Sequence, residues 1–542
     1  MKIAGRRILT FGLAAVLQLG VFFLLLTYLH DFASVIGILL LLYSVFALMH
    51  ILARYEESTY KILWLVTLLT FPILGAALYF LYGEKRAGKR LRKRMKGAEK
   101  MLTFPRMETA SGACLALGQK RKRLSLLLAS MEKTTGFPVR ENIYARYYPI
   151  GEQLYEKMLE EMEKARHFIY CEYFIINHGK MWDQMEEIMT RKAREGVVVR
   201  IMYDDLGSLG TFSPDEVERL AAKGLHCVRF NPIRFFTGSL NYRDHRKMLI
   251  IDGVSSFSGG VNLADEYINE EVRFGHWKDV GFHLTGPAVE NYTRMFVLFW
   301  ESITAEKLPE EEYMLSGSAG ERSPASVGDK AAEAYPACEE SSASAGEKDP
   351  EKYPAGGEDK ADGYVFSYYD SPLKEACISN SIYMDLLYQA KEYIWFYTPY
   401  LLPGDALLDA MVKAAERGVD VRIVTPGIPD KKMVFRMTRS YYKPLMQAGV
   451  KIYEYTPGFV HAKGCVMDGE VATVGTVNLD YRSLFLHYEN NSLFADASLV
   501  AQVREDMEET MALCRLQTDE DVKRSFWGEM RDGFLRIIAP LC

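Results

Sequence analysis

Hydrophobic and polar positions follow two alternating patterns between residues 138 and 315. Residues 154–176 begin with apolar positions three and four apart, which is typical of an amphipathic helix, and end in a continuous apolar run, which is typical of a buried strand. Residues 185–208 repeat this order, with a turn at Gly196 between helix and strand. Because helices and buried strands alternate, we expect a layered α/β domain with a largely parallel sheet.

The same order of segments returns later in the chain. Matching segments lie 216 to 225 residues apart: 165–177 with 390–402, 194–201 with 416–423, and 245–253 with 461–469. A general similarity between strand–helix units could explain one match, but three in the same order indicate a duplicated domain. We therefore expect an α/β fold with a first lobe at 138–315 and a second, pseudo-symmetric lobe at 364–542.

Residues 316–363 separate the two repeats. They are rich in Ser, Gly, Ala, Glu, Lys and Pro and contain almost no large aliphatic side chains. Such a segment cannot bury enough apolar area to offset the entropy lost on ordering. We expect a disordered linker or a surface insertion here.

The N-terminal region contains three apolar stretches, at Ile8–Leu29, Ser34–Leu52 and Ile62–Tyr82. Each has about the 20 residues needed to cross the hydrocarbon core of a bilayer. One such stretch alone is compatible with a buried core helix, but three in succession favour a membrane anchor. We therefore interpret residues 1–99 as an anchor with two or three transmembrane helices, followed by a helical connector at 100–137.

Basic side chains flank this anchor on both sides. Eight lie between residues 85 and 96, where they indicate either a solvated helix face or a segment attracted to anionic lipids. After three apolar stretches, this run predicts a multi-pass membrane protein whose following domains are cytoplasmic. Lys2, Arg6 and Arg7 place the N-terminus in the cytoplasm too, and three full spans cannot satisfy both.

The amino-acid composition excludes few classes of function. The formal net charge of −6 is too small to indicate a partner. The eight cysteines include no C-x-x-C pair and no zinc-like spacing with histidine. Buried free thiols are the expected state, which favours a reducing compartment.

One motif, H-x-K-x4-D-x6-G-x-x-N, occurs once in each repeat. The first copy comprises His245, Lys247, Asp252, Gly259, Gly260 and Asn262, and the second comprises His461, Lys463, Asp468, Gly475, Thr476 and Asn478. Residues between the Lys and the Asp are mostly apolar, which predicts a strand. Positions two apart on a strand share a face, so His and Lys point the same way.

An imidazole beside an ammonium group suits a phosphate. The Lys binds oxygens, the His approaches phosphorus, and the Asn amide donates to a further oxygen. Two histidines permit a two-step substitution in which one attacks phosphorus and the other protonates the leaving alkoxide. A carboxylate should orient at least one imidazole, and Asp279 and Glu489 are candidates, although surface ion pairing explains their spacing equally well. We expect no metal site, because Lys is a poor ligand and no acidic cluster accompanies it.

The double motif resembles that of the phospholipase D superfamily, and its context is similar to bacterial cardiolipin synthases. The supporting strings include NYRDHRKMLIIDG, FGHWKDVGFHLTGPAV, HAKGCVMDG and VGTVNLDYRSLFLHYEN, and LLTFPILGAALYFLYGE looks like that family's membrane anchor. The resemblance implies two α/β lobes with both motifs at their interface. It also implies a metal-free and cofactor-free reaction that joins two phosphatidylglycerol molecules and releases glycerol.

The resemblance also implies a role for each motif residue. His245 is the expected nucleophile, and His461 the expected general acid and base. The expected phosphate ligands are Lys247, Lys463, Asn262 and Asn478, and the family's histidine-orienting acids map onto Asp279 and Glu489. Asp252 and Asp468 belong to the catalytic motif, but we expect their role to be structural.

This chain departs from the superfamily pattern after the motif glycine. Many members have Ser where this chain has Gly260 and Thr476, so a hydroxyl is available only in the second half, and the half-sites need not bind phosphate equally. A hydrolytic phospholipase D, or another phosphatidyltransferase, would use the same motifs. A nuclease is disfavoured because the basic run lies beside the apolar stretches, and a non-enzymatic anionic-lipid-binding protein because both His–Lys pairs are intact.

Overall fold

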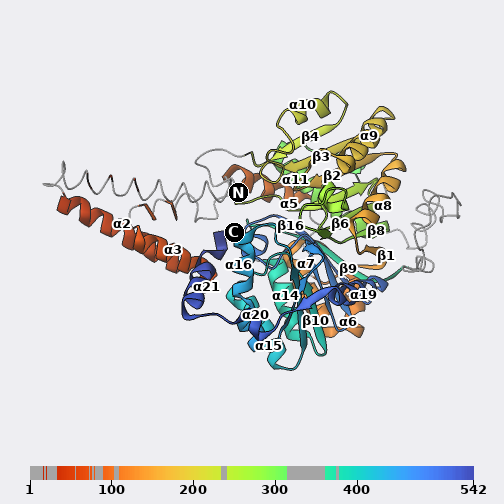
Figure 1. Cartoon of the computed structure of the whole chain (residues 1–542). Helices are drawn as coiled ribbons and strands as arrows, with labels where there is room; N and C mark the ends of the chain where they lie inside the picture. Colours follow the sequence, from red (N-terminus) through yellow and green to blue (C-terminus); the bar gives the residue numbers. More distant parts are fainter. Residues whose placement is uncertain are drawn as a thin grey trace.

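A computed structural model describes residues 33–54, 57–71, 74–75, 78–79, 89–102, 109–232, 241–313, 361–373 and 377–541, together with positions 16, 20 and 23. The expected linker lies outside the described residues up to position 360, as does nearly all of the first apolar stretch. In Figure 1 the strands of the first repeat appear mainly in yellow and green, and those of the second in teal and blue.

Fifteen strands of the two repeats form one continuous sheet. Its order is β17-β12-β11-β10-β14-β15-β16-β9-β1-β8-β6-β5-β2-β3-β4. The first-lobe strands are β1 (Arg140–Tyr148), β2 (Phe168–Tyr173), β3 (Val198–Asp204), β4 (His226–Phe230), β5 (Lys247–Ile251), β6 (Ser255–Gly259), β7 (His276–Lys278) and β8 (Gly281–Thr285). The second-lobe strands are β9 (Asp362–Asp370), β10 (Tyr393–Tyr397), β11 (Asp420–Pro426), β12 (Lys451–Tyr455), β13 (Gly458–Val460), β14 (Gly464–Met467), β15 (Val471–Gly475), β16 (Glu489–Ala495) and β17 (Cys514–Leu516).

The sheet is pseudo-symmetric about the antiparallel pair β1–β9. Strands β8, β6, β5, β2, β3 and β4 follow β1 in the same order in which β16, β15, β14, β10, β11 and β12 follow β9. This is the duplication that the repeated segments predict. The lobes do not merely touch, because they share one sheet and a hydrophobic cluster that spans both, while a second cluster lies mainly in the first lobe.

The expectation of a largely parallel sheet is wrong. Within the first lobe only β2–β3 and β3–β4 are parallel, and the second lobe repeats this with β10–β11 and β11–β12. Parallel neighbours need a crossover, which α9 (Lys180–Arg194) and α10 (Glu216–Ala221) supply in the first lobe. Strands β5 and β6 are instead joined by a tight turn with positive φ at Asp252 and Gly253, and such a turn makes neighbours antiparallel.

Helices cover the sheet in both lobes (Figure 1). They are α6 (Gly112–Lys120), α7 (Lys122–Thr135), α8 (Gly151–Glu163), α9 (Lys180–Arg194), α10 (Glu216–Ala221), α11 (Val289–Thr304), α12 (Glu310–Tyr313), α14 (Ile378–Gln389), α15 (Asp405–Glu416), α16 (Lys432–Ser440), α17 (Tyr442–Gln447), α18 (Tyr481–Phe485), α19 (Ser498–Ala512), α20 (Asp519–Val522) and α21 (Phe526–Ile538), with short 3-10 turns η3 (Asp265–Ile268), η4 (Gly286–Ala288) and η6 (Ala539–Leu541). Helix α11 is buried along most of its length and contacts both lobes, and Tyr292 on it hydrogen-bonds Ser492 on β16.

Three further helices precede the lobes: α2 (Ala33–Ala53), α3 (Ser58–Thr70) and α5 (Lys89–Leu102). The third apolar stretch does not form the single helix that its length predicts. Helix α3 ends before Phe71, which has an extended φ of −131°. Pro72 accounts for this, because a proline disfavours helical geometry in the residue before it. Helix α5 carries much of the basic run and packs Met95 and Ala98 against the first lobe.

In the part of the chain that the structure describes, no helix is both long and apolar enough to cross a bilayer. The expectation of two or three membrane-crossing helices is therefore not supported by the described helices.

Candidate active site

His245 is held in place by the second lobe. It lies two residues before β5, and its backbone N–H donates to the Tyr488 carbonyl at 2.9 Å. Its neighbour Arg246 is fully buried and pairs with Glu172 at 2.5 Å and with Asp244 at 3.0 Å. A buried charge network of this kind fixes the segment firmly, because breaking a buried ion pair by removing one partner leaves an uncompensated charge.

His461 is held in the same way by the first lobe. Its backbone N–H donates to the Lys278 carbonyl at 2.7 Å. The preceding strand β13 runs parallel to β7, and Val460 is paired with Lys278. Each histidine therefore lies just before its own lobe's motif strand, while its backbone donates a hydrogen bond to the other lobe.

The orienting acids are exchanged between lobes. His245 Nδ1 lies 2.9 Å from both carboxylate oxygens of Glu489. His461 Nδ1 lies 2.6 Å from Asp279 Oδ2. The structure thus brings together Asp279 and Glu489 with the two histidines, and it pairs each acid with the histidine of the opposite repeat. Because Nδ1 donates to the carboxylate, Nε2 of each ring is left with the lone pair or the transferable proton.

The two motif lysines lie beside their histidines. Lys247 Nζ donates to the His245 carbonyl at 2.6 Å. Lys463 Nζ donates to the His461 carbonyl and also lies 2.6 Å from His461 Nδ1. His461 Nδ1 can either donate to Asp279 or accept from the Lys463 ammonium, and we assign it as the donor to Asp279, because a bond to an ionised carboxylate is the stronger one.

The glycine–threonine difference after the motif follows from the two acids. A Cβ at Gly260 would come within 2.0 Å of Asp279 Oδ1, so only glycine leaves room for that carboxylate. In the second half, Thr476 Oγ1 lies 2.5 Å from Glu489 Oε2. The hydroxyl that is available only in the second half therefore contacts the orienting acid and the Asn490 carbonyl in this structure.

Each motif asparagine has one side-chain N–H that is used within the protein and one that is available to a ligand. Asn262 Nδ2 donates to the Tyr267 hydroxyl at 2.7 Å, and Asn478 Nδ2 donates to Asp480 Oδ2 at 3.0 Å. Each amide nitrogen carries two hydrogens, so the second remains for a ligand oxygen. Both side chains are buried.

Asp252 and Asp468 contact backbone rather than the histidines. Each has positive φ at a tight turn, and each accepts three backbone N–H groups from the segment that begins the neighbouring strand. For Asp252 these bonds come from residues 166–168, and for Asp468 from residues 391–393, all at 2.8–2.9 Å. These contacts are structural, so the two aspartates are better grouped with the fold than with the catalytic residues.

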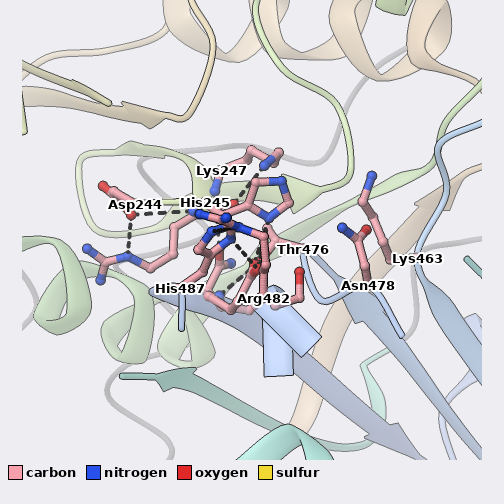
Figure 2. A network of polar contacts seen from close by, with 12 residues as sticks. Asp244, His245, Lys247, Lys463, Thr476, Asn478, Arg482 and His487 are labelled. Carbon is pink, nitrogen blue, oxygen red and sulfur yellow. Dashed lines mark hydrogen bonds and ion pairs between the residues drawn. The ribbon is translucent and has the colours of Figure 1, made fainter. Parts of the chain in front are cut away.

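A third histidine, which the motif does not include, lies at the site (Figure 2). The His487 ring is centred 5.7 Å from that of His245, and Arg482 Nε donates to His487 Nε2 at 3.2 Å. The hydrogen of the neutral ring is therefore on Nδ1, which lies 3.9 Å from Glu489 and has no hydrogen-bond partner in the described chain. The nearby sequence H-Y-E could have drawn attention to it, two residues before Glu489.

The corresponding place beside His461 is aromatic. Trp277, two residues before Asp279, has its ring centred 5.5 Å from His461, and the rings of Tyr267 and Phe459 lie at 5.3 and 5.9 Å. The two half-sites therefore differ in polarity, although their backbones are related by the duplication.

Burial and mutual repulsion control ionisation. Burial, together with Lys247, His487 and Lys463, lowers the pKa of His245 well below its usual value. Burial and Lys463 lower the pKa of His461 to about 4. Burial likewise lowers the pKa of Lys247 to about 8 and that of Lys463 to about 7. Because charges of each half act on the other, the two motifs form one electrostatic site.

The two acids are shifted in opposite directions. Burial raises the pKa of Glu489 well above its usual value despite Lys247. Burial would raise the pKa of Asp279 as well, but Lys463 and His461 outweigh it and lower that pKa overall. The lowered pKa favours the ionised form of Asp279, which can stabilise a positive charge on His461.

Among the residues that the structure describes, one set of donors has a composition that could hold a metal ion: His245, His487 and Glu489, whose ligand atoms lie within 4.8 Å of one another. Positive groups beside it oppose a cation, because Lys247 and Arg482 act on the same histidines. The donor set therefore fits an anion beside the histidines better than a metal between them.

Comparison with known proteins agrees with this geometry. Residues 383–511 match the family described as "Cardiolipin synthase, PLD-like domain", and residues 42–84 match "Phospholipase_D-nuclease N-terminal". The cardiolipin synthase of Geobacillus thermodenitrificans is 31% identical, covering 95% of this chain and 97% of its own. That of Geobacillus kaustophilus is also 31% identical, over 90% and 89%. An uncharacterized protein of Streptococcus mutans is 37% identical, over 89% and 96%.

A solved structure supports the fold. The phosphatidylserine synthase of Haemophilus influenzae superposes with a TM-score of 0.52 at 15% identity, covering 75% of this chain and 97% of its own. At that identity the likeness concerns the architecture. The family rests on the curated relatives, which are 31% identical over nearly the whole chain: the chain belongs to the bacterial cardiolipin synthase family of the phospholipase D superfamily.

Proposed function

We propose that this protein is a cardiolipin synthase that transfers a phosphatidyl group between two phosphatidylglycerol molecules. The observation that carries the proposal is the exchange of acids between lobes: His245 is oriented by Glu489 and His461 by Asp279. This arrangement presents two Nε2 atoms and two lysines to one buried site, as a substitution at phosphorus with acid–base assistance requires.

The pKa values of Asp279 and Glu489 are shifted in opposite directions, which supports different roles for the two histidines. A nucleophile must be neutral, and the pKa of His245 is lowered strongly by burial and surrounding positive groups. A general acid must carry a proton, and ionised Asp279 stabilises protonated His461. The phosphodiester anion, once bound, adds further negative charge that favours the protonated form. We therefore assign His245 as nucleophile and His461 as acid and base.

The reaction then proceeds in two balanced steps. His245 Nε2 attacks phosphorus, the bond from phosphorus to the glycerol oxygen breaks, and His461 gives its proton to the leaving glycerol oxygen. A hydroxyl of the second phosphatidylglycerol then gives its proton to His461 and attacks phosphorus, and the phosphorus–nitrogen bond breaks. Lys247, Lys463, Asn262 and Asn478 hold the phosphate oxygens in both steps.

Membrane attachment through the N-terminal helices belongs to the same proposal. The described side chains of α2 are mostly apolar and exposed, among them Ile38, Leu42 and Phe46. Exposing this apolar surface to water is unfavourable, whereas the lipid of a membrane would cover it. We place the two lobes on the cytoplasmic side, because the basic run follows the apolar stretches.

Product identification tests the function. Purified protein, given phosphatidylglycerol as the sole lipid in metal-free buffer, should form cardiolipin and release one glycerol per cardiolipin. Phosphatidate as the only phospholipid product would overturn the transferase assignment in favour of a hydrolytic phospholipase D. Absence of both products, with the protein folded, would overturn the enzymatic proposal itself.

A further inference from the structure

The C-terminal helix α21 exposes an apolar face. Phe526, Trp527, Met530 and Phe534 are 68%, 78%, 58% and 60% exposed. At 3.6 residues per turn they lie within an arc of roughly 100° on one side of the helix. Large aromatic side chains gathered in this way on a surface mark a contact with another apolar phase.

The opposite side of α21 is fixed to the second lobe. Leu535 is buried, and Arg536 donates to the Ser440 carbonyl at the end of α16. Glu529 pairs with Lys443 of α17 at 2.5 Å. The helix is therefore docked by its polar and buried side, and the aromatic face is presented outward by a folded support.

Exposed basic residues lie on the helix that packs against α21. Helix α16 packs against α21 and exposes Lys432, Met433 and Arg436. In the described chain, neither Lys432 nor Arg436 is paired with a carboxylate. Exposed aromatic residues beside unpaired basic residues match the interface of a bilayer that contains anionic lipids.

The surroundings of this face agree with a bilayer. On one side α21 contacts α3, which follows the apolar helix α2, and Figure 1 shows α2 extending away from the lobes beyond α21. Toward the active site, Lys431 donates to the Tyr400 hydroxyl at 2.9 Å. The Tyr400 ring is centred 6.5 Å from Phe459, whose ring lies 5.9 Å from His461.

We infer that α21, together with the basic surface of α16, is a membrane-docking face that inserts its aromatic side chains into an anionic bilayer. The inference rests on the proposed function insofar as the substrate is a membrane lipid. Docking would bring the edge of the second half-site, at Tyr400 and Lys431, to the lipid headgroups, so that phosphatidylglycerol reaches His461 without leaving the interface completely.

Tryptophan fluorescence gives a direct test. The chain has six tryptophans, and five of them are 6% exposed or less: Trp64, Trp182, Trp277, Trp300 and Trp395. The full-length protein is reconstituted into phosphatidylcholine–phosphatidylglycerol vesicles with or without brominated acyl chains. Trp64 lies on the membrane-attached helix α3 and contributes a constant background. We expect quenching to be clearly weaker in Trp527→Phe than in the wild type, and unchanged in the control Trp395→Phe.

The result that would overturn the inference is equal quenching by brominated lipid in the wild type and Trp527→Phe. If Trp527 were instead protected from aqueous iodide but not quenched by brominated lipid, a protein partner would cover the face, and the membrane assignment would be wrong.

A second measurement links docking to turnover. The double variant Trp527→Glu, Phe534→Glu should lose tenfold or more of the rate on phosphatidylglycerol vesicles and keep the wild-type rate on monomeric short-chain phosphatidylglycerol. Equal rates on vesicles would contradict the inference. If no phosphatidylglycerol of any kind yields cardiolipin, the proposed function fails, but the fluorescence result still decides whether α21 contacts lipid.

Discussion

At the scale of single residues, the site combines two buried histidines and two buried lysines, and burial together with the lysine charges lowers the pKa values of both histidines. Lys463 and Lys247 have pKa values lowered by burial to about 7 and about 8. A lysine is charged below its pKa, so the positive charge offered to phosphate is present at acidic pH and is lost as the pH rises through this range.

Phosphodiester affinity should therefore fall with pH. In the His245→Ala variant, which cannot react, the Kd for short-chain phosphatidylglycerol should rise by roughly tenfold or more between pH 6 and pH 9, because charge-assisted hydrogen bonds are lost. Isothermal titration measures this. Lys463→Arg, whose charge persists, is the matched control and should flatten the dependence. A constant Kd in His245→Ala would show that the lysines stay charged or do not bind phosphate.

We expect His487 Nδ1 to donate a hydrogen bond to a phosphate oxygen of the bound substrate, a role that the sequence motif does not include. His487→Phe removes the Nδ1 donor and should lower kcat/KM by roughly 10- to 100-fold, the expected cost of one bond to a charged oxygen. His487→Asn places an amide donor near the same position and should keep most of the activity. Equal losses in both variants would mean that His487 acts through packing only.

The motif residues could be identified from sequence because their spacing is local. His and Lys two apart on a strand share a face whatever the rest of the fold does. His487 could not be identified in this way, because its position depends on a contact with His245 from the other lobe. The sequence also could not show which acid orients which histidine. Both pairs join residues of different repeats that lie more than 180 positions apart.

At the scale of elements, backbone contacts between lobes determine where the histidines lie. Strand β7 of the first lobe pairs with β13 of the second, and the segment before β5 pairs with the segment before β16. The strands themselves were predictable from apolar runs. Their antiparallel pairing was not, because a buried apolar run has the same composition in parallel and antiparallel neighbours.

A substitution at Gly260 tests whether the close approach of its backbone to the Asp279 carboxylate matters for activity. Gly260→Ala would force Asp279 Oδ1 away from its place and disturb the bond to His461. We expect kcat to fall by roughly 100-fold, a typical general-acid contribution, with a small change in thermal stability. Gly112→Ala is the control, because a Cβ there meets no atom within 4 Å. Full activity in Gly260→Ala would show that Asp279 does not need its observed position.

At the scale of the whole molecule, duplication has produced one site rather than two. The shared sheet joins the lobes at β1–β9, and each lobe supplies one histidine, one lysine and the acid for the other lobe's histidine. The repeated segments predicted the two lobes. They did not predict the continuous sheet, because pairing between β1 and β9 connects residues more than 200 positions apart.

The duplicated halves have also diverged. One histidine is surrounded by Trp277, Tyr267 and Phe459, and the other by His487 and Phe174. The central claim is that this difference divides the work, with His245 as nucleophile and His461 as the acid that protonates the leaving group.

A substrate whose leaving group needs no proton separates these two roles most directly. With the p-nitrophenyl ester of phosphatidic acid, loss of the acid is tolerated in the first step, but loss of the nucleophile is not. Stopped-flow absorbance should show a burst of about one nitrophenolate per enzyme in His461→Ala and no burst in His245→Ala. A burst in His245→Ala, or its absence in folded His461→Ala, would contradict this division of roles.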